Sequence, residues 1–124
     1  MTNLTDLDVD TLNVGSDPVL GDDREVASAN GAIASKNGTV VITKGSAAAL
    51  TLAAPTATTD DWKRLTIVSS TAAAHTITNS SPGFNGGGSG SDVATMAASI
   101  GSTLELVAYQ GVWLVANSIG ITLA

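Results

Sequence analysis

The chain contains no cysteine and few aromatic or charged residues. Its 124 residues include two tryptophans, one tyrosine and one phenylalanine, and 13% are Asp, Glu, Lys or Arg. Without cysteine there is no disulfide, no thiolate metal ligand and no cysteine nucleophile. A core built mainly from Ala, Val, Thr, Ile and Leu buries less area per residue than one rich in aromatic side chains. We therefore expect a lone protomer to be marginally stable and association with further copies to supply the missing burial.

A basic leader and long apolar runs are also missing. The N-terminus has no basic stretch followed by an apolar core, and no apolar span reaches the length of about 18 residues that crosses a membrane. We therefore expect neither secretion by a signal peptide nor insertion into a membrane.

The net charge of -6 is carried by one end of the chain. Residues 1–25 contain seven acidic residues and one basic residue, Arg24, which gives -6 for this leader. Residues 26–124 contain four acidic and four basic residues, so the body is neutral. Neither part has the clustered Lys and Arg that bind a phosphate backbone, and we do not expect direct nucleic-acid binding.

The leader has the alternation of a β-strand. Apolar residues alternate with Asp or Asn, and no helical stripe is present. An isolated strand is not stable in water, so this segment needs a sheet edge in its own body, in another protomer or on a larger surface. We predict an extended acidic arm over residues 1–25, separate from a body over residues 26–124. Its candidate partner-binding residues are Leu4, Leu7, Val9, Leu12 and Val14.

The body is predicted to be all β. No amphipathic run of helix length occurs, and the β-rich stretches are 38–43, 48–53, 63–69, 74–78, 92–97 and 119–124. The turn at Lys44-Gly45 predicts a hairpin of the first two stretches, and the small residues 70–73 predict a hairpin of the next two. The pattern is typical of a small antiparallel β-sandwich or barrel, jelly-roll-like in kind.

Residues 100–117 hold the most regular pattern, and we expect the body to be organised around them. Apolar residues alternate on both sides of Gln110-Gly111, where Gly supplies the positive φ of a tight turn. This predicts a central hairpin. Tyr109 and Trp113 are placed to meet across its strands, a contact worth roughly 0.2–1 kcal/mol.

Asp6, Asp8 and Asp10 resemble the start of a calcium-binding loop. Such a loop continues with Gly at its sixth position and Glu at its twelfth, but here these are Thr11 and Asp17. Without that Gly the chain lacks the sharp bend that wraps the cation, so an acidic, solvated strand face is the better interpretation.

No other group of residues indicates catalysis, a metal or a cofactor. His75, the single histidine, shares a strand face with Ile77 and has no nucleophile or orienting partner, so we expect a hydrogen-bonded strand residue. The glycine-rich stretch 86–90 lacks the Lys-Ser/Thr and the helix of a phosphate loop, so we expect a mobile surface loop. Asp60-Asp61 beside Lys63 and Arg64 indicates a turn with local charge balance. We do not expect an enzyme.

Trp62 has two interpretations from the sequence. It either caps the core or is an exposed anchor at a subunit contact, where Trp is favoured. Together with Tyr109 and Trp113 it forms the set of candidate interface residues in the body.

Three stretches together resemble small virion proteins of tailed bacteriophages, of the capsid decoration (cement) or head-fibre kind. They are LTDLDVDTLNVG, LTLAAPTATTDDWKRLTIVSSTAAAHTIT and MAASIGSTLELVAYQGVWLVAN. The resemblance covers most of the chain, although similar bodies and leaders occur in tail-fibre and baseplate proteins. It implies a β-sandwich or barrel, commonly a homotrimer, that binds the outer capsid surface where major capsid proteins meet. It brings no catalytic residues.

The expected function is therefore structural. The protein would be made in the host cytoplasm, join the virion and stabilise the assembled shell by binding it better than the unassembled or expanded shell. The alternative is a tail-fibre, baseplate or glycan-binding receptor module that uses Trp62, Phe84, Trp113 and the loop 80–91 as a binding rim. A small hydrolase is a third alternative, for which the sequence pairs no nucleophile with a base.

Overall fold

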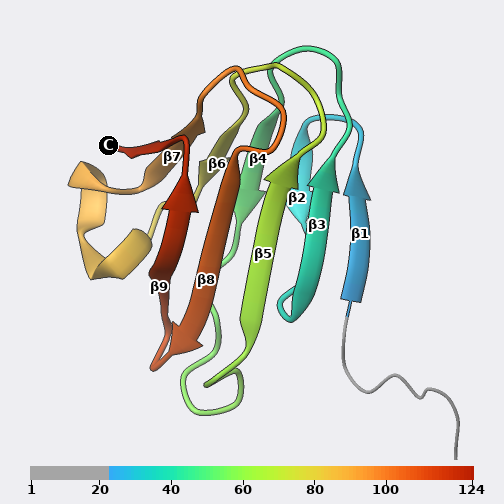
Figure 1. The fold of residues 1–124 in the computed structure, drawn as a ribbon. Coiled ribbons are helices and arrows are strands. Elements are labelled where there is room, and N and C mark those ends of the chain that lie inside the picture. Colours follow the sequence, from blue (N-terminus) through green and yellow to red (C-terminus); the bar gives the residue numbers. More distant parts are fainter. Residues whose placement is uncertain (1–22) are drawn as a thin grey trace, which may run out of the picture.

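The computed structural model describes residues 23–124, which form two packed five-stranded β-sheets (Figure 1). Sheet A has the strand order β1-β3-β5-β8-β9, and sheet B has the order β10-β7-β6-β4-β2. The predicted all-β class is confirmed. The strands are β1 (Asp23–Ala27), β2 (Gly31–Ile33), β3 (Gly38–Ile42), β4 (Ala49–Leu52), β5 (Arg64–Ser69), β6 (Thr76–Thr78), β7 (Val93–Met96), β8 (Thr103–Tyr109), β9 (Val112–Ile119) and β10 (Ile121–Leu123).

The first six strands alternate between the two sheets. β1, β3 and β5 are parallel neighbours in sheet A, and β2, β4 and β6 are parallel neighbours in sheet B. Each consecutive pair therefore makes one turn of a flat coil, and three turns stack over residues 23–33, 38–52 and 64–78. The sheets are consequently mixed and not purely antiparallel.

The two hairpins predicted within these coils are wrong. β3 and β4 lie in different sheets, as do β5 and β6, and each pairs with the equivalent strand of the next coil. A tight hairpin needs positive φ in its turn. Gly45 has no such φ, and residues 43–48 instead cross from sheet A to sheet B. Sheets in a sandwich pack about 10 Å apart, a distance that a two-residue turn does not span.

The C-terminal strands are antiparallel, and the predicted central hairpin is confirmed. β8 pairs with β9 through the turn Gln110-Gly111, whose φ angles of 48° and 81° are those of a primed hairpin turn. β8 also pairs antiparallel with β5, so the hairpin closes sheet A beside the last coil. Figure 1 shows the hairpin at the front, next to β5.

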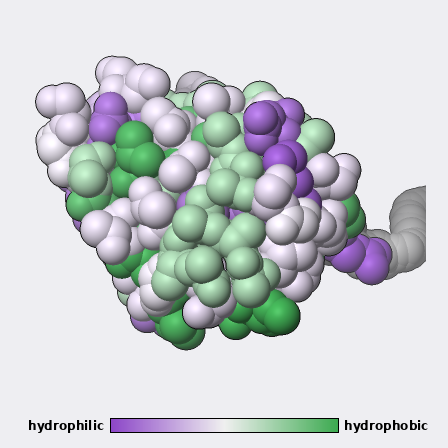
Figure 2. Space-filling view, turned by 90° about the horizontal axis from the view of Figure 1, so that it is seen from above, coloured by the Kyte–Doolittle hydropathy of each residue, from purple (hydrophilic) through white to green (hydrophobic). Residues whose placement is uncertain are grey.

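The core lies between the sheets and is built from alternate residues of the strands. Val40, Ile67 and Leu104 form one register row of sheet A and are wholly buried. Buried amides join the coils, since Asn79 donates from Nδ2 to the Leu52 carbonyl oxygen at 2.8 Å. Figure 2 shows the molecule from above. The surface on this side is mostly neutral or weakly hydrophobic, and strongly hydrophobic and strongly hydrophilic residues form small patches.

The start of the described chain is locked to β3. A Cβ on Gly38, whose φ is +146°, would overlap the carbonyl oxygen of Asp23, so the close approach of β1 and β3 requires glycine there. Because β1 begins at Asp23, residues 23–25 of the predicted arm lie in sheet A. The predicted arm residues Leu4, Leu7, Val9, Leu12 and Val14 lie outside the described residues.

The glycine-rich stretch is anchored to the sandwich. It forms two 3-10 turns, η1 (Phe84–Gly86) and η2 (Gly88–Gly90), and the Phe84 side chain is completely buried. The Asn85 side-chain oxygen accepts a hydrogen bond from the Val115 N–H at 2.9 Å. The expectation of a mobile surface loop overlooked Phe84, which gives the stretch an apolar attachment to the core.

Candidate interaction surface

The outer surface of sheet A, hereafter face A, carries an apolar row that crosses every strand of the sheet. Successive residues of a strand point to opposite sides, so one register row presents one side chain from each strand. In this row the members are Val26, Val41, Val68, Thr103 and Ile119. Val26 is 65% exposed and Ile119 is 58% exposed. Four of the five side chains in the row are therefore apolar. The two at the edges of the sheet are exposed, and Val41 and Val68 between them are half-buried.

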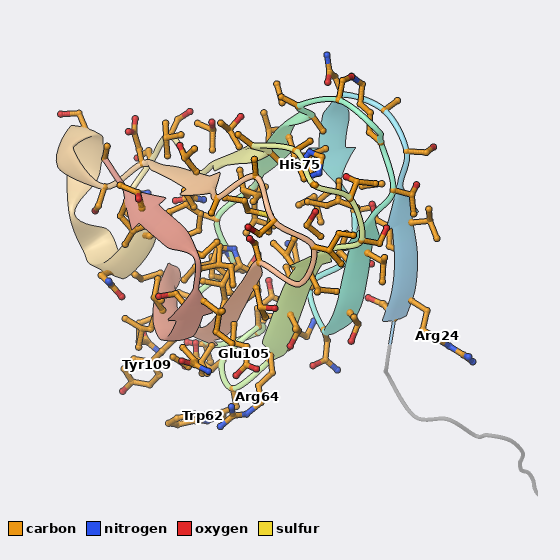
Figure 3. The ribbon with its side chains drawn as sticks, turned by 45° about the horizontal axis from the view of Figure 1, so that its top comes forward. Arg24, Trp62, Arg64, His75, Glu105 and Tyr109 are labelled. Atoms are coloured by element: carbon orange, nitrogen blue, oxygen red, sulfur yellow. The ribbon has the colours of Figure 1, made fainter. Side chains whose placement is uncertain are left out.

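A second apolar group lies on the same face near the hairpin turn. Val107 is paired with Leu114, and Tyr109 is paired with Val112. The ring of Trp62 packs against that of Tyr109, with ring centroids 5.2 Å apart and planes inclined by 42°. Figure 3 shows Trp62 and Tyr109 together at this corner of the molecule.

Exposed large hydrophobic residues are concentrated on face A. Among the described residues they are Val26, Trp62, Ile100, Tyr109, Leu114 and Ile119, and only Ile100 lies elsewhere, between β7 and β8. Side chains of this size and exposure present an apolar area on the order of 500 Å². A polar row of face A, made of Arg24, Thr39, Thr66, Glu105 and Asn117, separates the apolar row from the group near the hairpin turn, so this area is divided between two smaller patches. Exposed apolar patches rimmed by polar residues are typical of interaction sites.

The outer surface of sheet B, hereafter face B, has a different composition. One of its register rows consists of Ala49, Thr76, Thr95 and Thr122, and another consists of Ala32, Thr51, Thr78 and Val93. Threonine fits a pleated surface and exposes a hydroxyl to water. Face B therefore has the composition of a solvated sheet surface.

The backbone of Trp62 holds its side chain outward. Its φ is 72°, a left-handed conformation that a bulky residue rarely adopts, and the residue is 74% exposed. The Trp62 N–H donates to the Ala108 carbonyl oxygen at 2.8 Å, which ties the loop before β5 to the end of β8. A strained conformation persists only where the surroundings impose it, and such positions cluster at functional sites.

Asp60 organises the loop that carries Trp62. Its Oδ1 accepts from the Lys63 Nζ at 2.7 Å, and its Oδ2 accepts from the Thr56 N–H at 2.7 Å and from the Lys36 Nζ at 3.3 Å. The bond from Lys63, followed by that from Thr56, holds the pKa of the Asp60 carboxyl well below its usual range. The predicted local charge balance at this turn is confirmed for Lys63, and Lys36 adds to it.

Asp61 joins the same loop to the hairpin turn. Its Oδ1 accepts from the Gln110 N–H at 2.7 Å and from the Thr58 N–H at 3.1 Å, and its Oδ2 accepts from the Gln110 side-chain amide at 2.6 Å. Asp60 and Asp61, which directly precede Trp62, therefore tie its loop to Thr56 and Lys63 and to the hairpin turn that carries Tyr109.

A cleft of about 530 Å³ lies beside this aromatic pair. Trp62 lines it on one side, and Asp23 and Arg24 of β1 line it on the other. The remaining lining residues are Asn37, Gly38, Thr39, Arg64 and Thr66. In Figure 3, Arg64 lies next to Trp62, and Arg24 extends from β1 on the other side. The cleft is therefore lined by two arginines, an indole ring, Asp23 and neutral hydrogen-bonding groups, and the Arg24 side chain extends outward from its rim in Figure 3.

The structure separates the three predicted interface residues. Trp62 and Tyr109 are exposed on face A, in agreement with the interpretation of Trp62 as an exposed anchor. Trp113 is completely buried, and its Nε1 donates to the Ala53 carbonyl oxygen at 2.9 Å. It pairs with Ala108 and points inward, whereas Tyr109 pairs with Val112 and points outward. The predicted contact between Tyr109 and Trp113, and the interface role of Trp113, are wrong.

Face A as a whole was missed by the reasoning from sequence, although a signal for it was present. The stretches TVVI and TIV in β3 and β5 are apolar at consecutive positions, so both sides of these strands are apolar. Such runs are typical of strands covered on both faces. The side chains of Arg24 and Arg64 were also missed, because residues 24 and 64 line the same cleft only when β1, β3 and β5 stack in parallel.

His75 is hydrogen-bonded, as predicted, but it is also completely buried and lies directly before β6 instead of within a strand. Its Nδ1 accepts from the Ala48 N–H at 3.0 Å, and its Nε2 lies 2.9 Å from the Thr71 hydroxyl, which in turn donates to the Lys44 carbonyl oxygen. This arrangement fits a neutral ring protonated at Nε2. Burial, and next the charge of Lys44, lowers the pKa of His75.

Within residues 23–124 no group of three His, Asp or Glu side chains is placed to hold a metal ion, and no helix is long and apolar enough to cross a membrane. Comparisons with protein-family models, with curated proteins and with solved structures found no match to this chain.

Proposed function

We propose that the chain is a structural protein of a tailed-phage virion that decorates the outer capsid surface and stabilises the shell. Face A is the observation that carries this proposal. It presents an apolar row and a rigid Trp62–Tyr109 pair, whereas face B is covered by Thr and Ala. Trp and Tyr are the residues that most often dominate the binding energy of protein interfaces.

The architecture suits a load-bearing attachment better than a moving part. The strands of both sheets are joined by continuous ladders, and the loop that presents Trp62 is fixed by Asp60 and Asp61. A rigid surface loses little conformational entropy on binding. Binding to the assembled shell in preference to its unassembled subunits stabilises that shell by mass action.

Self-association would fit the same surface. The resemblance implies a homotrimer, and several copies joined around an axis would each contribute weak contacts to the major capsid protein. Linked weak contacts give lasting attachment because each further contact forms within the same complex.

Addition of purified full-length protein to undecorated phage shells tests this function. We expect saturable binding and a rise in the shell melting temperature. Trp62→Ser should weaken binding at least tenfold, because it removes an exposed anchor. The matched control is Ile100→Ser, which removes an equally exposed apolar side chain outside face A. Unchanged shell stability and no bound copies would refute the decoration function.

One observation favours the alternative, a glycan-binding tail-fibre or baseplate module. An exposed indole stands beside a cleft lined by Asn37, Thr39 and Thr66, and flat aromatic rings with neighbouring polar groups suit sugar rings. The rim predicted for this function is nevertheless wrong at Phe84 and Trp113, which are both buried. A glycan-binding screen separates the functions, because a decoration protein binds shells and ignores sugars.

A further inference from the structure

The basic residues of the described chain fall into two groups. Lys36 and Lys63 form the two salt bridges found among residues 23–124, both with Asp60. The Lys44 ammonium donates to the Ser46 hydroxyl at 2.7 Å. Arg24 and Arg64 take part in no ion pair with any described residue, and both line the cleft of face A. The cleft lining contains one acidic side chain, Asp23, and Glu105 lies on the same face beside Thr66, near Arg64 (Figure 3).

The same chain contains a segment of opposite charge. Residues 1–22 include five aspartates and no lysine or arginine, and the apolar residues of 4–14 alternate with polar ones. The described chain begins at Asp23, on the rim of the cleft. Residues 15–22 span at most about 28 Å, which allows residues 4–14 to reach a neighbouring molecule.

Among residues 23–124, no strand pairs with the outer edge of sheet A beside the cleft. β1 is the outermost strand on that side, and the opposite edge, β9, is covered by η1 through the bond from Val115 to Asn85. An open strand edge is a template for an extended segment, because its unpaired backbone groups bind a new strand. Residues 4, 6, 8, 10, 12 and 14 share one side of an extended segment. With that side on face A, Asp6, Asp8 and Asp10 would meet the guanidinium groups, and Leu12 or Val14 would meet Val26.

We propose that the cleft of face A binds the acidic segment 4–14 of a second copy of this chain. A segment bound along β1 within its own chain would cover Val26 but would bring no second face against the rest of the apolar row. Exchange between copies brings two such faces together, so it provides ion pairs for Arg24 and Arg64 and burial for the row at once. This inference rests on the self-association in the proposed function and supplies its contacts.

The absence of native cysteine makes disulfide mapping a direct test. One full-length chain carries Val9→Cys, or in a second series Leu12→Cys, so that both sides of the extended segment are sampled. The other full-length chain carries Thr39→Cys in the cleft or, as the control, Thr51→Cys on face B. Both threonines are exposed, so these variants are expected to fold. The mixtures are oxidised without any capsid present.

We expect the yield of the mixed disulfide with Thr39→Cys to be at least tenfold higher than that with Thr51→Cys. Adding R24Q/R64Q to the Thr39→Cys chain should lower its disulfide yield to that of Thr51→Cys. A salt concentration of 1 M should have the same effect, because it screens the ion pairs. Lys44→Gln, which removes a cation outside the cleft, should leave the yield unchanged. Circular dichroism of each variant verifies that the sandwich is intact.

Three results would overturn the inference. They are equal yields with the two acceptor positions, a yield unaffected by R24Q/R64Q, and a chain with both Val9→Cys and Thr39→Cys that links only within itself. Protection of the exposed Trp62 from acrylamide quenching by an acidic oligosaccharide, without any cross-link, would assign the cleft to a sugar. Since no capsid is used, failure here is separable from failure of the decoration function.

Discussion

The two outer faces of this sandwich are built from the same kind of strand but differ in what they expose. Face A carries Val26, Ile119 and the Trp62–Tyr109 pair, while face B carries rows of Thr and Ala. Both sheets bury one side in the shared core, so folding alone requires only that side to be apolar. The second apolar side of sheet A is not needed for the shared core, and the proposed interaction rests on this contrast between the two sheets.

The two tryptophans provide the sharpest test of this contrast. Trp113→Ala should lower the free energy of unfolding by about 3–5 kcal/mol, because the ring is completely buried and leaves a cavity. Trp62→Ala should change it by less than about 0.5 kcal/mol, because that ring is mostly exposed. Denaturant unfolding of both variants measures the difference. A comparable loss for Trp62→Ala would show that this ring serves folding and not a partner.

A charge placed on each face tests where association occurs. Val68→Lys lies in the apolar row of face A, and Thr78→Lys is its counterpart on face B. We expect Val68→Lys to weaken self-association or shell binding at least tenfold, about 1.4 kcal/mol, because a lysine would be buried at the contact. Thr78→Lys should have little effect. Solution mass across a dilution series gives the result, and equal effects of the two lysines would remove the distinction between the faces.

The loop that presents Trp62 gives a smaller and more local effect. Asp61→Asn weakens the bonds to Gln110 and Thr58, which join this loop to the hairpin turn. We expect a loss of about 1 kcal/mol in stability and easier acrylamide quenching of Trp62. Asp92→Asn, outside this loop, is the control. Unchanged quenching of Trp62 would show that Asp61 does not position the aromatic pair.

The smallest effect concerns the interior that both faces share. The pKa of buried His75 lies below its ordinary value of 6.5, so the unfolded chain binds more protons than the folded chain at slightly acidic pH. Stability should therefore fall as the pH drops below 6.5, and this contribution should stop changing below the folded pKa. Asp60 adds a separate loss only as the pH falls below 3.8, because its folded pKa is lowered.

Thermal unfolding between pH 7 and pH 5 checks the histidine contribution, with His75→Gln as the comparison. The variant should be less stable at pH 7 but should lose less stability over this range. An identical slope in both proteins would assign the pH dependence to other groups.

Local patterns in the sequence predicted some of this structure correctly. Alternation over 104–109 and the Gln110-Gly111 turn predicted the β8–β9 hairpin, because both signals are local. The hydrogen-bonded state of His75 followed from its place on an apolar face. The parallel coils were not predicted, because whether β3 continues into a hairpin or crosses to the other sheet depends on which sheet offers a free edge.

The candidate site was predicted only in part for the same reason. Exposure of Trp62 was one of two alternatives, since a single Trp after a turn fits both a cap and an anchor. The cleft depends on register between β1, β3 and β5, which sets Arg24 near Arg64 across strands that are 40 residues apart. Tyr109 and Trp113 were predicted to be in contact because both lie at the hairpin, but the register of β8 and β9 places their side chains on opposite sides of sheet A.

Footprinting with hydroxyl radicals is the most direct test of face A as the binding surface. The full-length protein would be labelled free at low concentration and again when bound to a phage shell. We predict strong protection of Trp62 and Tyr109 on binding, with Ile100, which lies outside face A, labelled equally in both states. Labelling of Trp62 and Tyr109 that is unchanged between the free and the bound protein would contradict the central claim.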